Sequence, residues 1–456
     1  MIEGFNLSFF FLKLKSSLGI DKAIGFTFIA RLIQALGSIG NLFLISLFLT
    51  KEEQGYFYTF TSLVAVQVFF ELGLNSIIIQ YTAHEVAHLK YTKEDFFFGS
   101  DIHLSRLSSM LHFCIKVFSI LSIILLLILN IIGYIFFNHY TLSNTDVNWS
   151  SPWILLTLST SLLLFINPIL GFLQGLGRVK ETSKILLYQQ IITIITTSIV
   201  LGFKGGLWTL GIANLLSVIF VMSYLFFSDN LIILKNIYNK INIWRIEYKK
   251  EILPYQYKIA LSWVSGYLIF QLFNPVIFAY EGPIIAGKMG LTIAAFNGIS
   301  VLGMSWISTK VPLFSSLIAL KNNQLLDDAF KKSLSQLLVI TFILIISFLF
   351  FVLLLNVLNI QLVSRFLPFT YLCLFAIITL VNQLIFSWAT YLRCHKQEPY
   401  LINSIVGGLL TATSTLLFGK YFGYKGIVIG YFALTVFLGL PWAYKTYLSK
   451  KREWYS

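Results

Sequence analysis

The chain has 456 residues, of which 57% are hydrophobic, 16% aromatic and only 11% charged, and its mean hydropathy is +0.80. So little polar surface cannot cover a water-soluble globule of this length, which excludes an ordinary soluble enzyme or binding domain. The formal charge of +14 would suggest nucleic acid in a soluble protein, but a membrane protein places its cations according to topology.

Apolar runs of about twenty residues, the length that crosses a bilayer as a helix, recur along the whole chain. They predict an all-α, polytopic membrane protein with about twelve transmembrane helices. The expected spans are approximately residues 25–48, 54–80, 113–137, 152–176, 184–201, 205–227, 256–280, 284–310, 334–358, 366–389, 400–418 and 424–446.

The basic residues are unevenly divided between the two sides that these spans define. With the amino terminus placed inside, 25 of the 33 Lys and Arg residues lie in inward-facing segments, five lie in outward loops and three lie within spans. One missed or extra helix would destroy this asymmetry, so we expect an even number of spans with both termini in the cytoplasm. The surface cations then contact lipid headgroups, and no nucleic-acid partner is expected.

A short turn is written twice in the chain. GFKGG begins at Gly202 between the fifth and sixth spans, and GYKGI begins at Gly423 between the eleventh and twelfth. Further echoes in the same order predict two pseudo-symmetric six-helix bundles in parallel orientation, an arrangement typical of transporters that rock about a central site. We expect an N-terminal bundle over residues 1–230, a basic cytoplasmic linker over 231–255 and a C-terminal bundle over 256–456.

Polar side chains form stripes on the first two spans. Such residues are costly in hydrocarbon and usually face a cavity or one another. Helical spacing places them on one face of each helix, namely Arg31, Gln34, Ser38 and Asn41 on the first span and Gln67, Glu71 and Asn75 on the second.

Two interpretations of these stripes remain open. In the first interpretation, Arg31 extends to the inner headgroups and Glu71 neutralises its charge, which holds the two helices together. Alternatively, the stripes line a water-filled cavity in which Arg31 meets an anionic group and Glu71 tunes it or carries a coupling proton. The second interpretation predicts a substrate-binding site.

The second half offers fewer candidates for the opposite wall of that site. The residues that could line it are Asn274, Asn297, Ser300, Asn382 and Gln383, although hydrogen bonding between helices explains them equally well. Lys288 lies near the outer surface, seven residues after Glu281, where a salt bridge at a gate and a substrate contact are both reasonable.

A zinc-protease pattern, His84-Glu85-Val86-Ala87-His88, has the right spacing but the wrong context. It stands where the second span leaves the membrane and has no evident third ligand, so we expect an amphipathic surface helix there. A weak metal site is not excluded by the sequence, because His103 and His112 are near. No P-loop occurs in the chain, so we expect no ATP hydrolysis by that route. No long outside loop offers room for a glycosyltransferase or polymerase site, and we expect no cofactor and no enzymatic activity.

Several stretches together resemble a known family. They are LTKEEQGYFYTF, FFELGLNSIIIQYTAHEVAHL, GFLQGLGRVKE, IIAGKMGLTIAAFNGIS and VPLFSSLIALKNNQ. They resemble the bacterial Wzx-type flippases of lipid-linked oligosaccharides, within the multidrug/oligosaccharidyl-lipid/polysaccharide exporter superfamily. The resemblance is diffuse and extends over essentially the whole chain.

The resemblance implies a transporter of the bacterial inner membrane that moves a polyprenyl-diphosphate-linked oligosaccharide to the periplasmic leaflet by alternating access, for O-antigen or other surface polysaccharide. Its implied partners are the lipid-linked oligosaccharide, membrane lipids, a polysaccharide polymerase and a chain-length regulator. Arg31 is the residue that best suits a cavity for the diphosphate. The alternatives are a cation-coupled multidrug exporter of the same superfamily and, more distantly, a polysaccharide polymerase or ligase.

Overall fold

The computed structural model describes residues 37, 40–92, 96–140, 147–240, 243–395 and 397–455. Within these residues, ten helices are long and apolar enough to cross a membrane. The last of them, Leu401–Trp454, has 54 residues and covers both of the final two expected spans, with a kink at Gly423. The first expected span lies mostly outside the described residues, of which 40–48 are helical. The fold is therefore that of a polytopic helical membrane protein.

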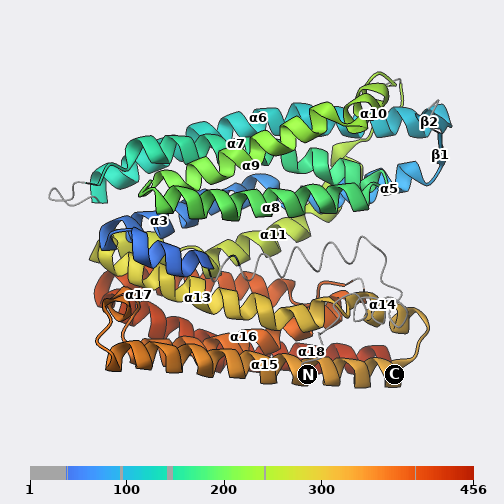
Figure 1. Ribbon diagram of the computed structural model, residues 1–456. Helices are drawn as coiled ribbons and strands as arrows, with labels where there is room; N and C mark the ends of the chain where they lie inside the picture. The colour runs from blue at the N-terminus through green and yellow to red at the C-terminus, as the bar shows by residue number, and fades with distance from the viewer. Residues whose placement is uncertain are drawn as a thin grey trace, which may run out of the picture.

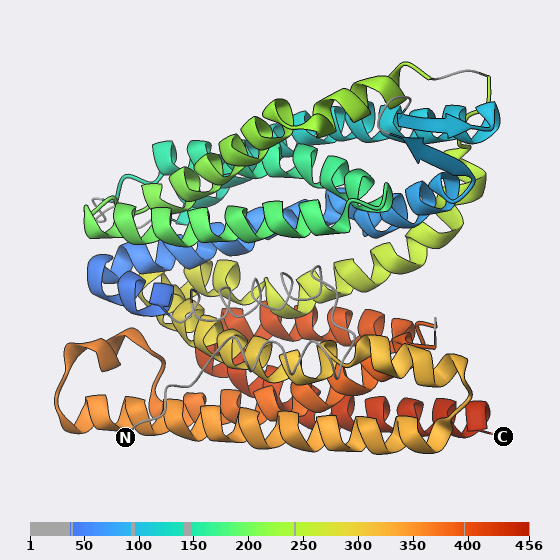
Figure 2. The ribbon, with the colours of Figure 1, turned by 45° about the vertical axis from the view of Figure 1, so that its right-hand side comes forward.

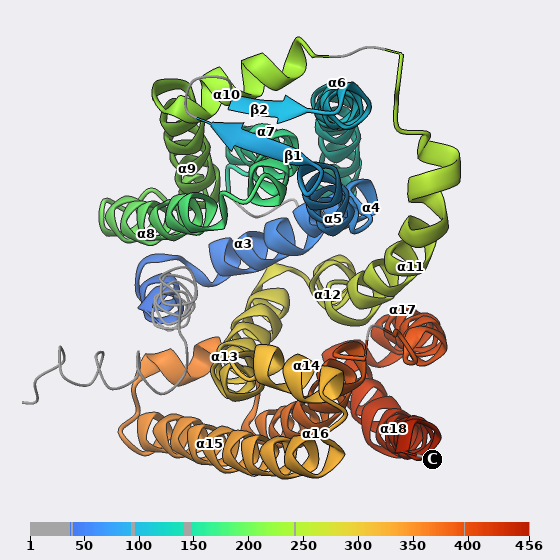
Figure 3. The ribbon, with the colours of Figure 1, turned by 90° about the vertical axis from the view of Figure 1, so that its right-hand side faces the viewer.

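The helices gather into two groups that lie side by side (Figures 1 and 3). The N-terminal bundle contains α3 (Lys51–Val64), the 3-10 turn η1 (Ala65–Gln67), α4 (Val68–Glu71), α5 (Leu74–Val86), α6 (Asp101–Tyr140), α7 (Ser150–Gly175), α8 (Val179–Gly202), α9 (Trp208–Phe227) and α10 (Asp229–Tyr238). The C-terminal bundle follows the short π-helix η2 (Tyr248–Ile252) and contains α11 (Leu253–Phe270), α12 (Phe273–Glu281), α13 (Pro283–Ser308), α14 (Val311–Ala319), α15 (Asn323–Val357), the 3-10 turn η3 (Gln361–Arg365), α16 (Phe369–Arg393), α17 (Leu401–Ala433), the π-helix η4 (Leu434–Gly439) and α18 (Leu440–Tyr455). The domain boundaries at 230 and 256 stay predictions.

A small antiparallel ribbon departs from the all-α expectation. Strand β1 (Leu89–Thr92) pairs with β2 (Phe96–Gly99), with Leu89 opposite Gly99. It lies beside α6 and α10 (Figure 3). The first three residues of the His84–His88 pattern are helical, as the last residues of α5, and an amphipathic surface helix there stays a prediction. The segment that follows forms the ribbon, where aromatic residues favour strands.

Aromatic packing joins the two bundles at one end. The rings of Tyr56 and Phe278 lie 4.9 Å apart, and those of Phe60 and Trp153 lie 5.0 Å apart. Phe137 of α6 contacts Phe60, Trp153 and Phe278 at ring distances of 5.1 to 5.6 Å. Because all five rings are almost fully buried, this cluster ties α3, α6 and α7 of the N-terminal bundle to α12 of the C-terminal bundle.

The bundles meet at that end and diverge toward the other. Figure 2 shows α3 close to α12 and α13, whereas α5 and the ribbon lie far from α14. We call the end that carries Gly55 and Gly287 the Gly55 end. The opposite end, which carries η2, the ribbon and α14, is the linker end.

Candidate functional site

Glycines bring α3 and α13 into close contact at the Gly55 end. A Cβ atom added to Gly55 would overlap the carbonyl oxygen of Pro283. A Cβ added to Gly287 would lie 2.9 Å from the backbone nitrogen of Gly55, and one added to Gly290 would overlap the ring of Tyr58. Only residues without a side chain allow two helices to approach this closely.

Polar groups reinforce the same contact across the two bundles. The buried side chain of Gln54 donates a hydrogen bond to the carbonyl oxygen of Gly287, at 2.7 Å. Arg365 in η3 donates to the carbonyl oxygen of Leu49 at 2.7 Å, and Asn274 of α12 donates to Ser62 of α3 at 3.3 Å. The Asn274 contact agrees with the interpretation of this residue as a link between helices.

The α13 face that packs on α3 becomes exposed along the helix. Gly287 and Gly290 are buried against α3, whereas Asn297 and Val301, which follow on the same side at helical spacing, are exposed. Trp263 of α11 is also 43% exposed. The close contact between α3 and α13 thus ends near the middle of α13, and Asn297 lies beyond it on an exposed part of the helix.

The second span is broken at the predicted acidic residue. Leu72 and Gly73 have positive φ values of 44° and 71°, so α4 ends at Glu71 and α5 begins anew. Breaks in membrane helices are tolerated where they are buried in protein or line a cavity. Glu71 accepts a weak hydrogen bond of 3.5 Å from Asn167 of α7. It therefore faces the interior of the N-terminal bundle.

Two further amides accompany Glu71. The carbonyl oxygens of Gln67 and Asn75 are buried without a hydrogen-bond partner among the described residues. A Cβ added to Gly171 would overlap that oxygen of Asn75, so Asn75 faces α7 as Glu71 does. Buried polar atoms without partners are costly, which marks this region of α4 and α5 as a polar site inside the bundle.

The remaining candidates on the first span are mostly untested. Arg31, Gln34 and Ser38 lie outside the described residues, and with them the proposed pairing of Arg31 with Glu71. Asn41 is half-buried, and its carbonyl oxygen has no hydrogen-bond partner within the described chain.

The two copies of the repeated turn differ in backbone conformation but have similar neighbours. In the first copy Lys204 and Gly206 have positive φ and separate α8 from α9, whereas in the second only Gly423 does, and α17 continues through it. Glu53 lies beside Gly206, and Glu281 accepts a 2.6 Å hydrogen bond from the backbone of Tyr424. In each half, an acidic residue near the hairpin between the first two spans contacts the repeated turn.

Lys288 is half-buried on α13, and the structure records no ion pair for it among the described residues. The salt bridge with Glu281, one of its two expected roles, is not formed. Glu281 instead contacts the Gly423 turn. The other role, contact with substrate, stays a prediction.

Glu85 of the zinc-protease pattern takes part in an ion-pair network. Glu85 is 2% exposed, and its two carboxylate oxygens lie 2.9 Å from Arg106 Nε and 2.6 Å from His103 Nδ1. Arg106 also pairs with Glu251 of η2, with an Nη1–Oε1 distance of 3.3 Å. Within the described residues no group of three potential ligands could hold a metal ion. The network joins α5 and α6 to the linker.

The charge of Glu251 depends on this network. Burial alone would raise its pKa, but the hydrogen bond from Arg106, the backbone N–H of Glu247 and the positive charge of Arg106 together lower the pKa below its ordinary value. The ionised carboxylate is therefore the stable form at neutral pH.

Sequence reasoning missed an apolar cavity of about 280 Å³ between the two bundles. Leu42, Phe43 and Ser46 form one wall, and α13, α15 and η3 form the others, with Ala295, Phe348 and Phe366 among the lining residues. No periodicity could have revealed it, because its walls are ordinary apolar faces of helices far apart in sequence.

No protein-family model matches the chain, and no curated protein matches it in sequence. Solved structures do match over nearly the whole length. An inward-facing multidrug resistance MATE family transporter of the MOP superfamily aligns with TM-score 0.56 and 15% identity, over 92% of this chain and 99% of that one. The MATE multidrug transporter DinF-BH aligns with TM-score 0.56 and 14% identity, over 93% of this chain and 94% of that one.

The lipid II flippase MurJ, in an inward closed conformation, aligns with TM-score 0.54 and 13% identity, over 93% of this chain and 88% of that one. This chain has the fold of the MOP-superfamily transporters. The likeness to the Wzx-type flippases of that superfamily rests on the sequence stretches alone.

Proposed function

We propose that the protein flips a polyprenyl-diphosphate-linked oligosaccharide from the cytoplasmic to the periplasmic leaflet of a bacterial inner membrane. A diphosphate headgroup cannot cross hydrocarbon unaided, because the transfer of an ion from water into a low-dielectric medium is strongly unfavourable. A hydrated crevice between two bundles lowers that barrier while the lipid tail stays in an apolar environment.

The apolar cavity between the bundles carries this proposal. It is lined by Leu42, Phe43 and the α13–α15 pair, and its volume of about 280 Å³ suits a segment of a branched hydrocarbon tail. The same helix α13 carries the exposed Asn297 on another face. In this proposal the tail occupies the apolar cavity on one side of α13, and the headgroup passes along the side that carries Asn297.

Flipping in vesicles that contain the purified chain tests the proposal. Ser347→Trp on α15 adds a large ring to the lining of the apolar cavity, whereas Ile346→Trp adds the same ring at the neighbouring position, which does not line the cavity. The added ring should disfavour entry of the lipid tail by about 1–3 kcal/mol, as expected for overpacking. The flipping rate should therefore fall roughly tenfold or more for Ser347→Trp and stay unchanged for Ile346→Trp. Equal rates for the two variants would remove the cavity from the mechanism, and absence of flipping by the unaltered chain would refute the function.

A cation-coupled drug exporter is the second candidate, and Glu71 favours it. A carboxylate at a helix break inside the N-terminal bundle, with one weak hydrogen bond from Asn167, is suited to take up a proton or a cation. Export of a cationic dye driven by a proton gradient, abolished by Glu71→Gln, would support this function. The implied polymerase and chain-length partners follow only from the first proposal.

A further inference from the structure

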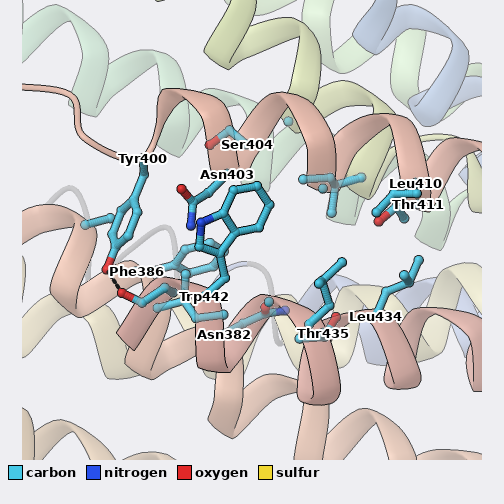
Figure 4. A pocket seen from close by; sticks show the side chains of 18 of the residues that line it. Asn382, Phe386, Tyr400, Asn403, Ser404, Leu410, Thr411, Leu434, Thr435 and Trp442 are labelled. Carbon is cyan, nitrogen blue, oxygen red and sulfur yellow. Dashed lines mark hydrogen bonds between the residues drawn. The ribbon is translucent and has the colours of Figure 1, made fainter. Parts of the chain in front are cut away.

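A second cavity lies inside the C-terminal bundle, away from the interface between the bundles. It has a volume of about 270 Å³ and is lined by residues of α11, α16, α17, η4 and α18. Figure 4 shows Asn382, Asn403 and Trp442 in its wall, together with Tyr400, whose hydroxyl donates to the carbonyl oxygen of Ala443 at 2.8 Å. Among its lining residues, Asn382 is the one that the sequence had marked as a candidate.

Free hydrogen-bonding groups line this cavity. Asn382 donates its amide N–H to Tyr431 at 3.0 Å, and Asn403 donates to Thr446 at 3.5 Å. Among the described residues, nothing bonds the carbonyl oxygen of either amide or the indole N–H of Trp442. Two acceptors and one donor are therefore available to a bound molecule.

The cavity carries no unpaired charge. Arg393 is the one charged residue among the described residues that line it, and its guanidinium is held by Glu398 at 2.6 Å. An ionic ligand would have to leave water for a site without a counter-charge, which is unfavourable. The site therefore suits a neutral ligand.

The backbone is shaped around the empty volume. The wall at Leu434–Gly439 is a π-helix, a wide turn often found at functional sites. A Cβ atom added to Gly266 or to Gly407 would meet no other atom within 4 Å, although both residues line the cavity. Glycine at these positions, where helix propensity favours almost any other residue, keeps the cavity open.

We propose that this cavity binds one neutral sugar ring. Aromatic faces beside amide oxygens and an N–H donor match a ring that has apolar faces and hydroxyl groups at its rim. An acyl chain would leave those polar groups without partners, which costs free energy. A volume near 270 Å³ holds about one ring, since drug-sized ligands need roughly 300 Å³ or more. The choice of a sugar rests on the proposed function, whereas the neutrality and the free hydrogen-bonding groups do not.

Binding is tested on the full chain, purified in a detergent without a sugar headgroup. Tryptophan fluorescence is titrated with N-acetylglucosamine, galactose and the anionic glucuronate. We expect a saturable response to at least one neutral sugar, lost in Trp442→Phe, and a response to glucuronate weaker by about tenfold or more, because the site lacks a free cation.

Gly407→Leu fills the cavity, and Gly202→Leu is the matched control, since its added side chain also meets open space but lies at the end of α8. We expect Gly407→Leu to abolish the neutral-sugar response and Gly202→Leu to preserve it. If Gly407→Leu does not fold, Asn403→Leu removes one acceptor and should weaken binding by about tenfold, as expected for one hydrogen bond in a buried site.

Several results would overturn the inference. They are no saturable response to either neutral sugar, equal binding of glucuronate, an unchanged response in Gly407→Leu, and a phospholipid that native mass spectrometry finds bound to the unaltered chain but not to Gly407→Leu. Sugar binding by a chain that does not flip the lipid-linked substrate would contradict the proposed function and support this site. Flipping by a chain that does not bind sugar would support the proposed function and contradict this site.

Discussion

The two ends of the interface between the bundles are joined in different ways. At the Gly55 end, α3 and α13 touch through glycines, and a buried hydrogen bond from Gln54 to Gly287 crosses the contact. At the linker end the bundles diverge, and the contacts there include the pairing of Arg106 with Glu251 and a hydrogen bond from Tyr81 to the carbonyl oxygen of Glu251, just before α11. One end is thus a close contact between two helices, and the other is held by ionic and polar contacts with the linker.

The two ends are expected to behave differently when the bundles move. A packed contact between two preformed faces can separate and close again as a unit, whereas an ion pair in a linker can hold the chain while the bundles rock. The Gly55 end is therefore expected to open and the linker network to stay formed. Changes at each end test whether the two ends differ in this way.

Loss of Arg106 should have the largest effect. Arg106→Leu leaves Glu85 buried without its main partner, and breaking a buried pair in this way costs about 3–5 kcal/mol. Thermal unfolding in detergent should show a large loss of stability. Arg393→Leu is the matched control, because its partner Glu398 is more exposed and surface pairs contribute only about 0–1 kcal/mol. Equal losses in the two variants would show that the network has no special role.

A side chain at Gly55 should have the next largest effect. Gly55→Leu would clash with the backbone of Pro283, and overpacking of this kind costs about 1–3 kcal/mol. We expect this variant to favour the state in which the Gly55 end is open. The accessibility of a cysteine introduced at Thr59, now fully buried, measures the shift. No change in labelling relative to the chain that keeps Gly55 would contradict the close contact.

The hydrogen bond from Gln54 offers a milder change at the same end. Gln54→Leu keeps the volume but leaves the carbonyl oxygen of Gly287 without this donor, which should cost about 1 kcal/mol. The melting temperature should fall slightly and cysteine labelling at Thr59 should rise. Unaltered labelling would indicate that packing alone closes this end.

Acid should weaken the linker end by a small amount. The pKa of Glu251 is lowered in the folded chain, so its stabilising contribution is complete above the ordinary value of 4.5 and is lost as the pH falls through the folded pKa. Melting temperatures between pH 7 and pH 3 should decline less steeply for Glu251→Gln than for the unaltered chain. Parallel curves would contradict the assigned ion pair.

The spans could be predicted from composition because burial in lipid requires long apolar runs, and every described span overlaps an expected one. The path of the chain through Gly423 could not be predicted, because the repeated turn has positive φ at its third and fifth residues in one copy, Lys204 and Gly206, and at its first residue, Gly423, in the other. Local sequence does not decide whether a helix stops or kinks when tertiary contacts from Glu53 and Glu281 differ.

The sequence predicts the polar stripe on the second span but not which helix the stripe faces. Spacing placed Glu71 and Asn75 on one face, whereas the break at Leu72 and Gly73 separates them into two helices that both face α7. The cavity around Asn403 and Trp442 escaped notice because single polar residues on three helices share no spacing. Such sites follow from packing and not from periodicity.

Two distances measured between spin labels test whether the bundles alternate. One pair joins Lys51 of α3 to Ile284 of α13 at the Gly55 end, and the other joins Ala83 of α5 to Leu313 of α14 at the linker end. If the bundles alternate around the crevice, the lipid-linked substrate should lengthen the first distance in part of the population and shorten the second in the same part. Two distances that never change, or that lengthen together, would contradict alternating access.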